Sequence, residues 1–251
     1  MSDQESFISH LIELRERLIR AMVAALFGFG LLLVWPGAGA IYDYLALPLM
    51  EALPQGTRMI ATGVITPFLI PLKVTAVAGF MLALPYVLYQ AWAFVAPGLY
   101  EHEKKLALPI VVASTALFFI GVAFCYYFVF GRVFTFINQF APKSITPAPD
   151  IEAYFNFVIT MFIAFGVAFE IPIVVIVLVR AGIVEVAKLV EWRRYVILGN
   201  AVIAAVVTPP DAVSMLALLI PMCLLYEAGL IVARFTSRSK SVPQDSADPA
   251  H

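Results

Sequence analysis

The chain has 251 residues, of which 62% are hydrophobic and 13% are charged. Soluble domains carry about 45–50% apolar and about 25% charged residues, so this chain has too few polar side chains to cover a water-facing surface. The composition excludes a soluble enzyme and a disordered chain, and its 16 basic and 17 acidic residues exclude a basic surface for nucleic acid, which leaves a membrane protein.

Apolar stretches long enough to cross a bilayer recur along the chain. The hydrocarbon core is about 30 Å thick and takes about 20 helical residues. The fifth stretch is shorter, because Arg194 and Pro209 enclose 14 residues, or about 21 Å of helix. We predict an all-α protein with six transmembrane helices, the fifth short, near residues 18–35, 68–94, 108–131, 153–179, 195–208 and 212–233.

The segments between these helices differ in basic charge. Those on one side of the membrane carry 12 Lys and Arg residues, and those on the other side carry three. Because Lys and Arg accumulate in cytoplasmic loops, we predict that both termini lie in the cytoplasm, which an even number of helices requires. We expect a membrane domain over residues 1–236 and a disordered polar tail over 237–251.

Three segments connect helices on the opposite, outer side. In the first, Ile41 to Leu53 is apolar enough to lie as a helix along the membrane interface. In the second, over residues 132–152, three prolines argue against a continuous helix. The third is the turn Pro209-Pro210-Asp211, and we expect Asp211 to cap the sixth helix by accepting hydrogen bonds from its free N–H groups.

Motifs of catalysis and of metal binding are missing from the sequence. The three histidines lie outside the predicted helices, and there is no Gly-x-Ser-x-Gly, His-Glu-x-x-His or Gly-rich phosphate motif. No two acidic residues lie mid-membrane where they could act as a protease pair. We expect neither enzymatic activity nor a metal or other cofactor.

Glu170 lies near the middle of the fourth predicted span. Nine residues separate it from Val179, which is about 13.5 Å of helix. A carboxylate at this depth costs a few kcal/mol and is by default a functional-site hypothesis. Three interpretations stay open: a polar contact for a transmembrane partner, a proton site, or a neutral acid that is hydrogen-bonded inside the bundle.

Two cytoplasmic segments carry acidic side chains beside apolar ones. In the first, Glu13 and Arg17 have the favourable four-residue spacing, so a self-paired surface helix and a binding surface are both consistent with the sequence. In the second, Glu101 and Glu103 follow an aromatic stretch that ends the second predicted span. Carboxylates beside an apolar rim suit a bidentate arginine pair on a partner.

Four separated stretches combine into one pattern. They are His10-Leu11-Ile12-Glu13-Leu14-Arg15, Pro85 to Phe94 running on to Pro97 to Glu103, Ala164 to Pro172, and Thr208-Pro209-Pro210-Asp211. In their order and their side of the membrane they resemble the TatC family, the multispanning subunits of the twin-arginine protein translocase. The resemblance extends from about His10 to Arg234.

The resemblance implies a receptor for signal peptides with two consecutive arginines, which helps to move folded proteins across the cytoplasmic (inner) membrane. It also implies TatB-like and TatA-like single-span partners, further copies of the chain in the receptor complex, and the transmembrane proton gradient as driving force. It implies that Glu13 and Glu103 receive the arginine pair, with Arg15 and Phe94 in the same motifs. The other matching positions are Glu170, the family's intramembrane acidic residue, and Pro48 and Asp211, with structural or gating roles.

Two positions depart from the family. Gly63 stands where members often have an acidic residue, and Met215 stands where a polar residue such as Gln can occur. Two other classes of function stay open, a proton-coupled small-solute carrier organised around Glu170 and a passive assembly scaffold without a peptide site. The lack of an internal repeat and of a second intramembrane charge counts against the carrier.

Overall fold

A computed structural model describes residues 3–53, 57–99, 107–140, 148–208 and 211–238. Within these ranges the regular structure is helical, apart from one isolated parallel bridge between Ile60 and Asp150. The all-α class predicted from the composition is therefore confirmed.

Five stretches of the described chain are helical, long and apolar enough to cross a membrane. They are α1 (Asp3–Val34), α3 (Thr66–Leu99), the continuous helix from α4 (Ala107–Phe124) through a π-helical segment (Cys125–Phe130) to α5 (Gly131–Phe140), the pair α6 (Ile151–Phe169) and α7 (Ile171–Arg180), and α10 (Ala212–Arg238). The helix α9 (Arg193–Val207) has only 15 residues, about 22 Å, and is the short fifth span of the prediction. The molecule is thus a six-helix membrane protein.

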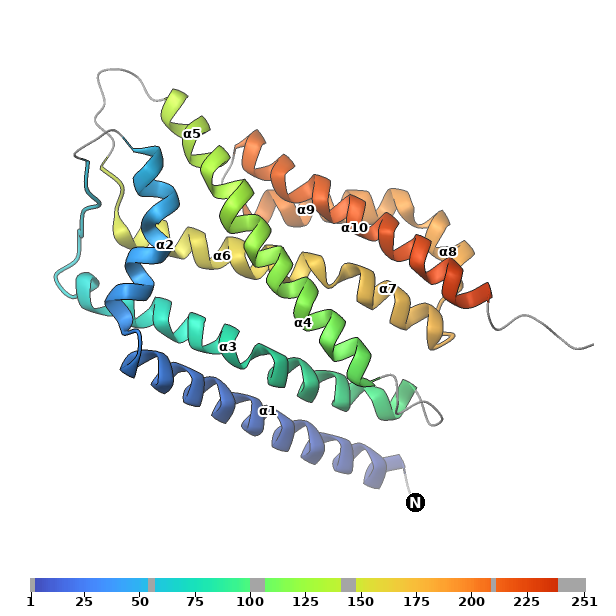
Figure 1. Cartoon of the computed structure of the whole chain (residues 1–251). Helices are drawn as coiled ribbons and strands as arrows, with labels where there is room; N and C mark the ends of the chain where they lie inside the picture. The colour runs from blue at the N-terminus through green and yellow to red at the C-terminus, as the bar shows by residue number, and fades with distance from the viewer. Residues whose placement is uncertain (1–2, 54–56, 100–106, 141–147, 209–210, 239–251) are drawn as a thin grey trace, which may run out of the picture.

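The spanning helices lie side by side, and the short elements gather at their two ends (Figure 1). The start of α1, the end of α3, α8 (Val186–Glu191) and the end of α10 lie at one end, which we call the terminal end. At the opposite end, the cap end, α2 (Ala38–Ala52) crosses the ends of spanning helices, and α5 forms the end of the third spanning helix beside it. This crossing agrees with the interfacial helix expected over Ile41 to Leu53.

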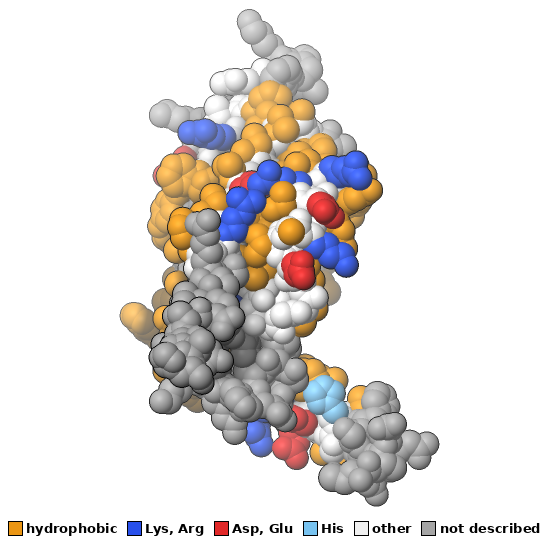
Figure 2. All heavy atoms as spheres, turned by 90° about the vertical axis from the view of Figure 1, so that its right-hand side faces the viewer, with side chains coloured by type: hydrophobic (Ala, Val, Ile, Leu, Met, Phe, Trp, Pro, Cys, Tyr) orange, Lys and Arg blue, Asp and Glu red, His pale blue; other side chains and the backbone are white. Residues whose placement is uncertain are grey.

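Charged side chains face the viewer at the terminal end (Figure 2), where Lys and Arg are interspersed with acidic residues. Arg180, Lys188 and Arg194 are exposed around α8. The Nη2 of Arg193 lies 2.6 Å from Glu227 Oε2 on α10, so this ion pair joins α9 to α10. Some of the basic residues that the topology prediction rests on therefore lie at the terminal end, while Lys104, Lys105 and Lys240 lie outside the described residues.

Three predicted segments differ in detail from the structure. The third span continues as α5 to Phe140, where the sequence indicated an irregular cap from residue 132, because the first proline comes only at position 142. The fourth span is interrupted at Glu170, because Pro172 has no N–H to continue the helical hydrogen bonds. The last helix runs to Arg238, two residues into the predicted tail 237–251, of which residues 239–251 lie outside the described chain.

The central helix of the bundle is α6. Its buried side chains include Phe155, Met161 and Phe165, each with no exposed surface, and they contact residues of most neighbouring helices. By contrast, α1 is a peripheral helix, since only 6% of its most apolar window is buried. Helix α1 packs mainly against α3 and leaves the rest of its circumference to the membrane.

The backbones of α1 and α3 touch at two glycines. A Cβ on Gly28 would lie 2.5 Å from the carbonyl oxygen of Gly79, and a Cβ on Gly79 would lie 2.5 Å from the Cα of Phe29. Small residues allow membrane helices to approach closely, and van der Waals packing then holds them together. This contact, which we call the glycine seam, is possible only without side chains at both positions.

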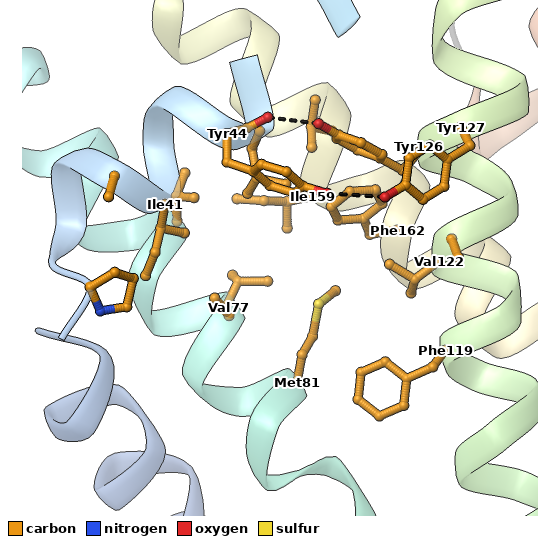
Figure 3. Close-up of a pocket in the computed structure, with 17 residues that line it drawn as sticks. Ile41, Tyr44, Val77, Met81, Phe119, Val122, Tyr126, Tyr127, Ile159 and Phe162 are labelled. Atoms are coloured by element: carbon orange, nitrogen blue, oxygen red, sulfur yellow. Dashed lines mark hydrogen bonds between the residues drawn. The ribbon is translucent and has the colours of Figure 1, made fainter. Parts of the chain in front are cut away.

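At the cap end, tyrosine hydroxyl groups attach α2 to the bundle. Tyr154 donates a 2.8 Å hydrogen bond to the carbonyl oxygen of Leu45, and the hydroxyls of Tyr44 and Tyr127 lie 3.1 Å apart. Beneath them is an apolar cavity of about 440 Å³ between α2, α3, α4 and α6 (Figure 3). The hydroxyl groups therefore close the cap end over apolar side chains such as Val77 and Phe119.

Asp150 links the two outer segments. The N–H of Ile151 donates to the carbonyl oxygen of Ile60 at 2.9 Å, and the hydroxyl of Thr62 donates to Asp150 Oδ2 at 2.6 Å. Asp150 Oδ1 accepts a 2.8 Å bond from the N–H of Glu152 and so caps α6. These hydrogen bonds from Thr62 and Glu152 lower the pKa of the Asp150 carboxyl.

We expect the protein to become less stable at acidic pH, because Asp150 then becomes protonated. A carboxyl with a lowered folded-state pKa contributes stability above its unfolded pKa of about 3.9, and this contribution is lost as the pH falls through the lowered value. Thermal unfolding followed by circular dichroism should therefore occur at lower temperature as the pH falls below about 4. Asp150→Asn keeps a capping oxygen without titrating, so its acid-dependent decrease should be smaller, and an equal decrease would contradict the prediction.

Candidate functional site

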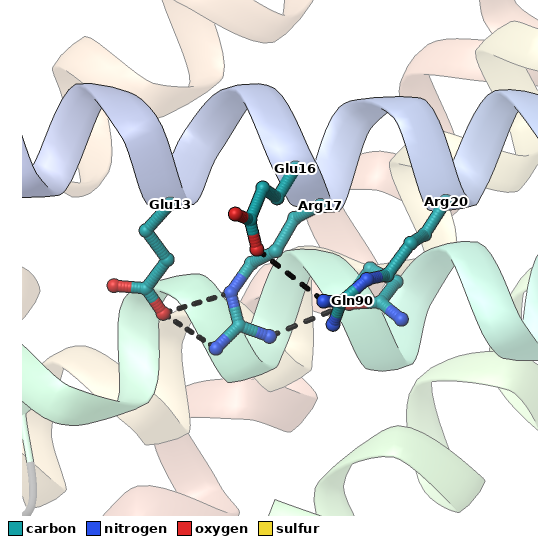
Figure 4. A network of polar contacts seen from close by, with 5 residues as sticks. All are labelled: Glu13, Glu16, Arg17, Arg20 and Gln90. Carbon is teal, nitrogen blue, oxygen red and sulfur yellow. Dashed lines mark hydrogen bonds and ion pairs between the residues drawn. The ribbon is translucent and has the colours of Figure 1, made fainter.

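At the terminal end, the first turns of α1 meet the last turns of α3 through a polar contact (Figure 4). Arg17 donates to Glu13 Oε1 from Nε at 2.9 Å and from Nη2 at 2.5 Å. Its Nη1 donates to the Oε1 of the buried Gln90 at 3.4 Å, so Arg17 bridges the two helices. Glu13 is thus self-paired, as the spacing indicated, while its Oε2 accepts no hydrogen bond from the described residues.

An aromatic contact lies on the same junction. The ring of His10 on α1 stacks on Phe94 of α3, with centroids 4.3 Å apart and planes at 21°. Gln90 and Phe94 are four residues apart and therefore share the face of α3 that meets α1. Residues from the first two motifs, separated by about 80 positions, come together here. We call this junction of His10, Glu13, Arg17, Gln90 and Phe94 the dock.

Two predicted site residues are not part of these contacts. Arg15 is exposed on α1, and its side chain forms no hydrogen bond or ion pair with the described residues. Glu103, like Glu101, lies outside the described residues, because the description of α3 stops at Leu99. Arg17, Gln90 and His10 were not predicted as site residues, although the four-residue spacing of Glu13 and Arg17 was a signal for the first of them.

Glu170 lies at the break between α6 and α7 and contacts α4. Its Oε2 accepts a short hydrogen bond from the hydroxyl of Ser114, a fully buried residue. Ser114 Oγ in turn accepts a 3.3 Å hydrogen bond from Nε1 of Trp92 on α3. The other oxygen, Glu170 Oε1, is buried and has no hydrogen-bond partner in the part of the chain that the structure describes. Burial of such an atom is costly, so the site is incomplete as it stands.

Asp211 lies at the cap end and begins α10. Its Oδ1 accepts a 2.7 Å hydrogen bond from the N–H of Ser214, and its carbonyl oxygen accepts one from Met215 at 3.2 Å. The predicted capping role is confirmed. Met215 packs against the main apolar core, and an added side chain on Gly63 would contact the hydroxyl of Thr66.

Pro48 leaves one carbonyl oxygen of α2 without its helical hydrogen-bond donor. Because proline has no N–H, the carbonyl oxygen of Tyr44, four residues earlier, has no helical donor. The hydroxyl of Tyr126 donates to this oxygen at 2.7 Å. The oxygen that Pro48 leaves without a helical donor thus takes part in a link between α2 and the third spanning helix.

We expect Tyr126→Phe to destabilise the protein by about 1 kcal/mol, because the carbonyl oxygen of Tyr44 then loses its donor. In a Pro48→Ala background the new N–H of residue 48 can bond to that oxygen, so the same change should cost less. Thermal unfolding of the four variants in detergent measures both costs. Equal costs in the two backgrounds would show that Pro48 and Tyr126 act independently.

The described residues contain no group of three or more His, Cys, Asp or Glu side chains arranged to hold a metal ion. Lys73, which lies within the second predicted span, donates a 2.6 Å hydrogen bond to Asn156 Oδ1 on α6. Among the described residues, buried side-chain atoms without a hydrogen-bond partner inside a span include the hydroxyl oxygens of Thr115 and Ser214 and, as the acidic oxygen among them, Glu170 Oε1.

A family model described as "Sec-independent protein translocase protein (TatC)" matches residues 9–221. The chain belongs to the TatC family. The TatC protein of Haemophilus influenzae is 46% identical over 94% of this chain and 91% of its own length. That of Escherichia coli K12 is 42% identical over 94% of this chain and 90% of its own length.

A solved structure supports the same assignment. The crystal structure of the twin-arginine translocase receptor TatC superposes with a TM-score of 0.80 and 35% identity, over 91% of this chain and 100% of the other. The TatC relatives are named Sec-independent protein translocase proteins. These matches give no support to a small-solute carrier organised around Glu170.

Proposed function

We propose that this chain is the receptor subunit of a twin-arginine translocase, which binds signal peptides with two consecutive arginines and helps to move folded proteins across the cytoplasmic membrane. The observation that supports this most directly is the dock, in which Glu13 and Phe94 come from separate TatC motifs and meet on one surface. Membership of the TatC family supports the proposed class of ligand, a signal peptide with two consecutive arginines.

The dock has the chemistry that an arginine pair needs. A guanidinium group is planar and forms bidentate hydrogen bonds with carboxylates, which a lysine ammonium does not. Glu13 Oε2 accepts no hydrogen bond from the described residues, and the side chain is 38% exposed, so a guanidinium group can reach it beside Arg17. We assign the second acceptor to Glu103, in the segment that follows α3, and we place Arg15 in the same surface through its motif.

The apolar part of a signal peptide also needs a surface. The stacked rings of His10 and Phe94 lie beside the carboxylate, and exposed apolar side chains such as Leu14 and Leu18 continue along α1. Because α1 is buried so little, a peptide helix has lateral access from the bilayer. Carboxylate and apolar surface are therefore adjacent, as recognition of a charged and then apolar peptide requires.

We further propose that the terminal end faces the cytoplasm. Arg180, Lys188 and Arg194 are exposed there, and basic residues favour the cytoplasmic side. The protein would then lie in the cytoplasmic (inner) membrane with both termini inside. Single-span TatB-like and TatA-like proteins and further copies of this chain are its proposed partners, and the buried, unpaired Glu170 Oε1 is the proposed contact for a polar side chain of such a partner.

A photo-crosslinking amino acid at position 103 tests the function. In membranes that contain the full chain and its partners, we expect crosslinks to a peptide with two arginines and far fewer to the same peptide with two lysines. The control carries the crosslinker at the exposed position of Asp43 on α2, at the cap end, where no crosslinks are expected. Equal crosslinking of both peptides at position 103 would overturn the proposed function.

A further inference from the structure

A chain of two hydrogen bonds leads from α3 to Glu170. The indole Nε1 of Trp92 donates to Ser114 Oγ at 3.3 Å, and the hydroxyl of Ser114 donates to Glu170 Oε2. An indole N–H can only donate. Because it occupies an acceptor position on Ser114, the hydroxyl hydrogen of Ser114 is free to point at the carboxyl group. The order of donors therefore runs in one direction, from Trp92 to Glu170.

This order determines which carboxyl oxygen remains available. Ser114 is fully buried, and its hydroxyl engages Oε2, so Oε1 is the oxygen left without a partner. Without Ser114 the two oxygens would be equivalent and the carboxyl group could rotate. The hydroxyl thus fixes the orientation of the one intramembrane acid that the proposed function uses.

Trp92 lies in α3 between two of the residues that contact α1 at the dock. Gln90 accepts a hydrogen bond from Arg17, and Phe94 stacks on His10. Residues four apart share a helix face, whereas a residue two positions away points about 200° from each. One stretch of α3 therefore contributes Gln90 and Phe94 to the dock on one face. On the opposite face it contributes Trp92 to the hydrogen bonds that lead to Glu170.

We propose that Trp92 and Ser114 are positioning residues that couple occupancy of the dock to the orientation of Glu170, an inference that rests on the proposed function. An arginine that binds Glu13 beside Arg17 brings a second positive charge against Arg17, and Arg17 is also the residue that bonds to Gln90. The resulting shift of α3 acts on the Trp92–Ser114 bond. At 3.3 Å this bond is already longer than the usual 2.7–3.2 Å range, so a small displacement breaks it.

When the bond from Trp92 is broken, Ser114 is free to turn and Glu170 is no longer fixed. The receptor then has two arrangements around Glu170, and peptide binding changes their populations. By linkage, a partner side chain that binds Glu170 Oε1 changes the affinity for peptide by the same factor. The structure thus connects the site for the export signal to the site for the single-span partner.

Infrared difference spectroscopy of the full receptor complex tests the coupling. Addition of twin-arginine peptide should change the carboxyl vibration of Glu170, assigned by its loss in Glu170→Gln. Trp92→Phe removes the N–H but keeps an aromatic ring, and we expect this variant to bind peptide while the peptide-dependent change at Glu170 is lost. Ser114→Ala should shift the Glu170 vibration even without peptide, which a purely structural role of Ser114 would not require.

Trp192→Phe is the matched control. Trp192 is exposed beside α8, far along the chain from the dock, so the loss of its N–H should leave the peptide-dependent change intact. A change at Glu170 that persists in Trp92→Phe, or its absence in the unmodified receptor with peptide bound, would overturn the coupling alone. Failure of the unmodified receptor to bind peptide would overturn the proposed function and the coupling with it.

Discussion

Replacing Glu13 with glutamine is expected to weaken binding of a twin-arginine peptide by about ten- to hundredfold, because a hydrogen bond to a charged group contributes about 1.5–3 kcal/mol. Glutamine has nearly the same shape, but it offers one neutral acceptor and no negative charge. Titration of a fluorescent peptide into the purified receptor complex measures the affinity. The loss should become smaller at high salt, because screening already weakens the charge interaction in the unmodified protein.

Glu16→Gln is the control for this change. Glu16 lies three positions further along α1, is exposed, and pairs with Arg20 at 3.3 Å (Figure 4). Glu16→Gln makes the same change in net charge as Glu13→Gln, but Glu16 is not part of the dock. We expect its effect on affinity to stay within about twofold, as for an exposed ion pair. An equal loss in both variants would indicate a general electrostatic attraction in place of a specific carboxylate.

Replacing Gly28 with leucine is expected to open the glycine seam. The first carbon of the new side chain would lie 2.5 Å from the carbonyl oxygen of Gly79, and a backbone atom has no other rotamer to adopt. Overpacking of this kind costs about 1–3 kcal/mol. Thermal unfolding in detergent should therefore begin at lower temperature, and peptide affinity should fall because α1 no longer holds Glu13 against α3.

Gly30→Leu provides the matched comparison. Gly30 lies on the same helix, and a Cβ there meets no atom within 4 Å. Leucine has a higher helix propensity than glycine, so this variant should be as stable as the unmodified chain or slightly more stable. Equal destabilisation by both substitutions would mean that α1 does not depend on close packing at Gly28.

The sequence predicted the spanning helices because hydrophobicity and length are properties of a single segment. The short α9 followed from Arg194 and Pro209 at its ends, and the cap of α10 followed from Asp211. Residues 3–17 of α1 precede the predicted apolar run and carry several charges. The four-residue spacing of Glu13 and Arg17 indicated a surface helix there, and the structure joins this helix to the first span without a break.

The contacts between helices could not be predicted from the sequence, because they depend on how distant segments face each other. Nothing in the local pattern indicates that His10 stacks on Phe94 or that Trp92 reaches Ser114. Glu170 was identified from its depth, but the break that exposes it to α4 depends on Pro172 and its neighbours in three dimensions. The dock itself is a product of tertiary packing between two motifs that the sequence showed separately.

Because α1 packs mainly against the single helix α3, it can tilt as a lever about the glycine seam. Fifteen residues, about 22 Å, separate the pivot at Gly28 from Glu13. A change in tilt of about 10°, well within the range that membrane helices adopt as bilayer thickness varies, moves the carboxylate by about 4 Å. Such a displacement exceeds the length of a hydrogen bond. Lipid composition should therefore tune how faithfully an export signal is read, without any change in the amino acids that read it.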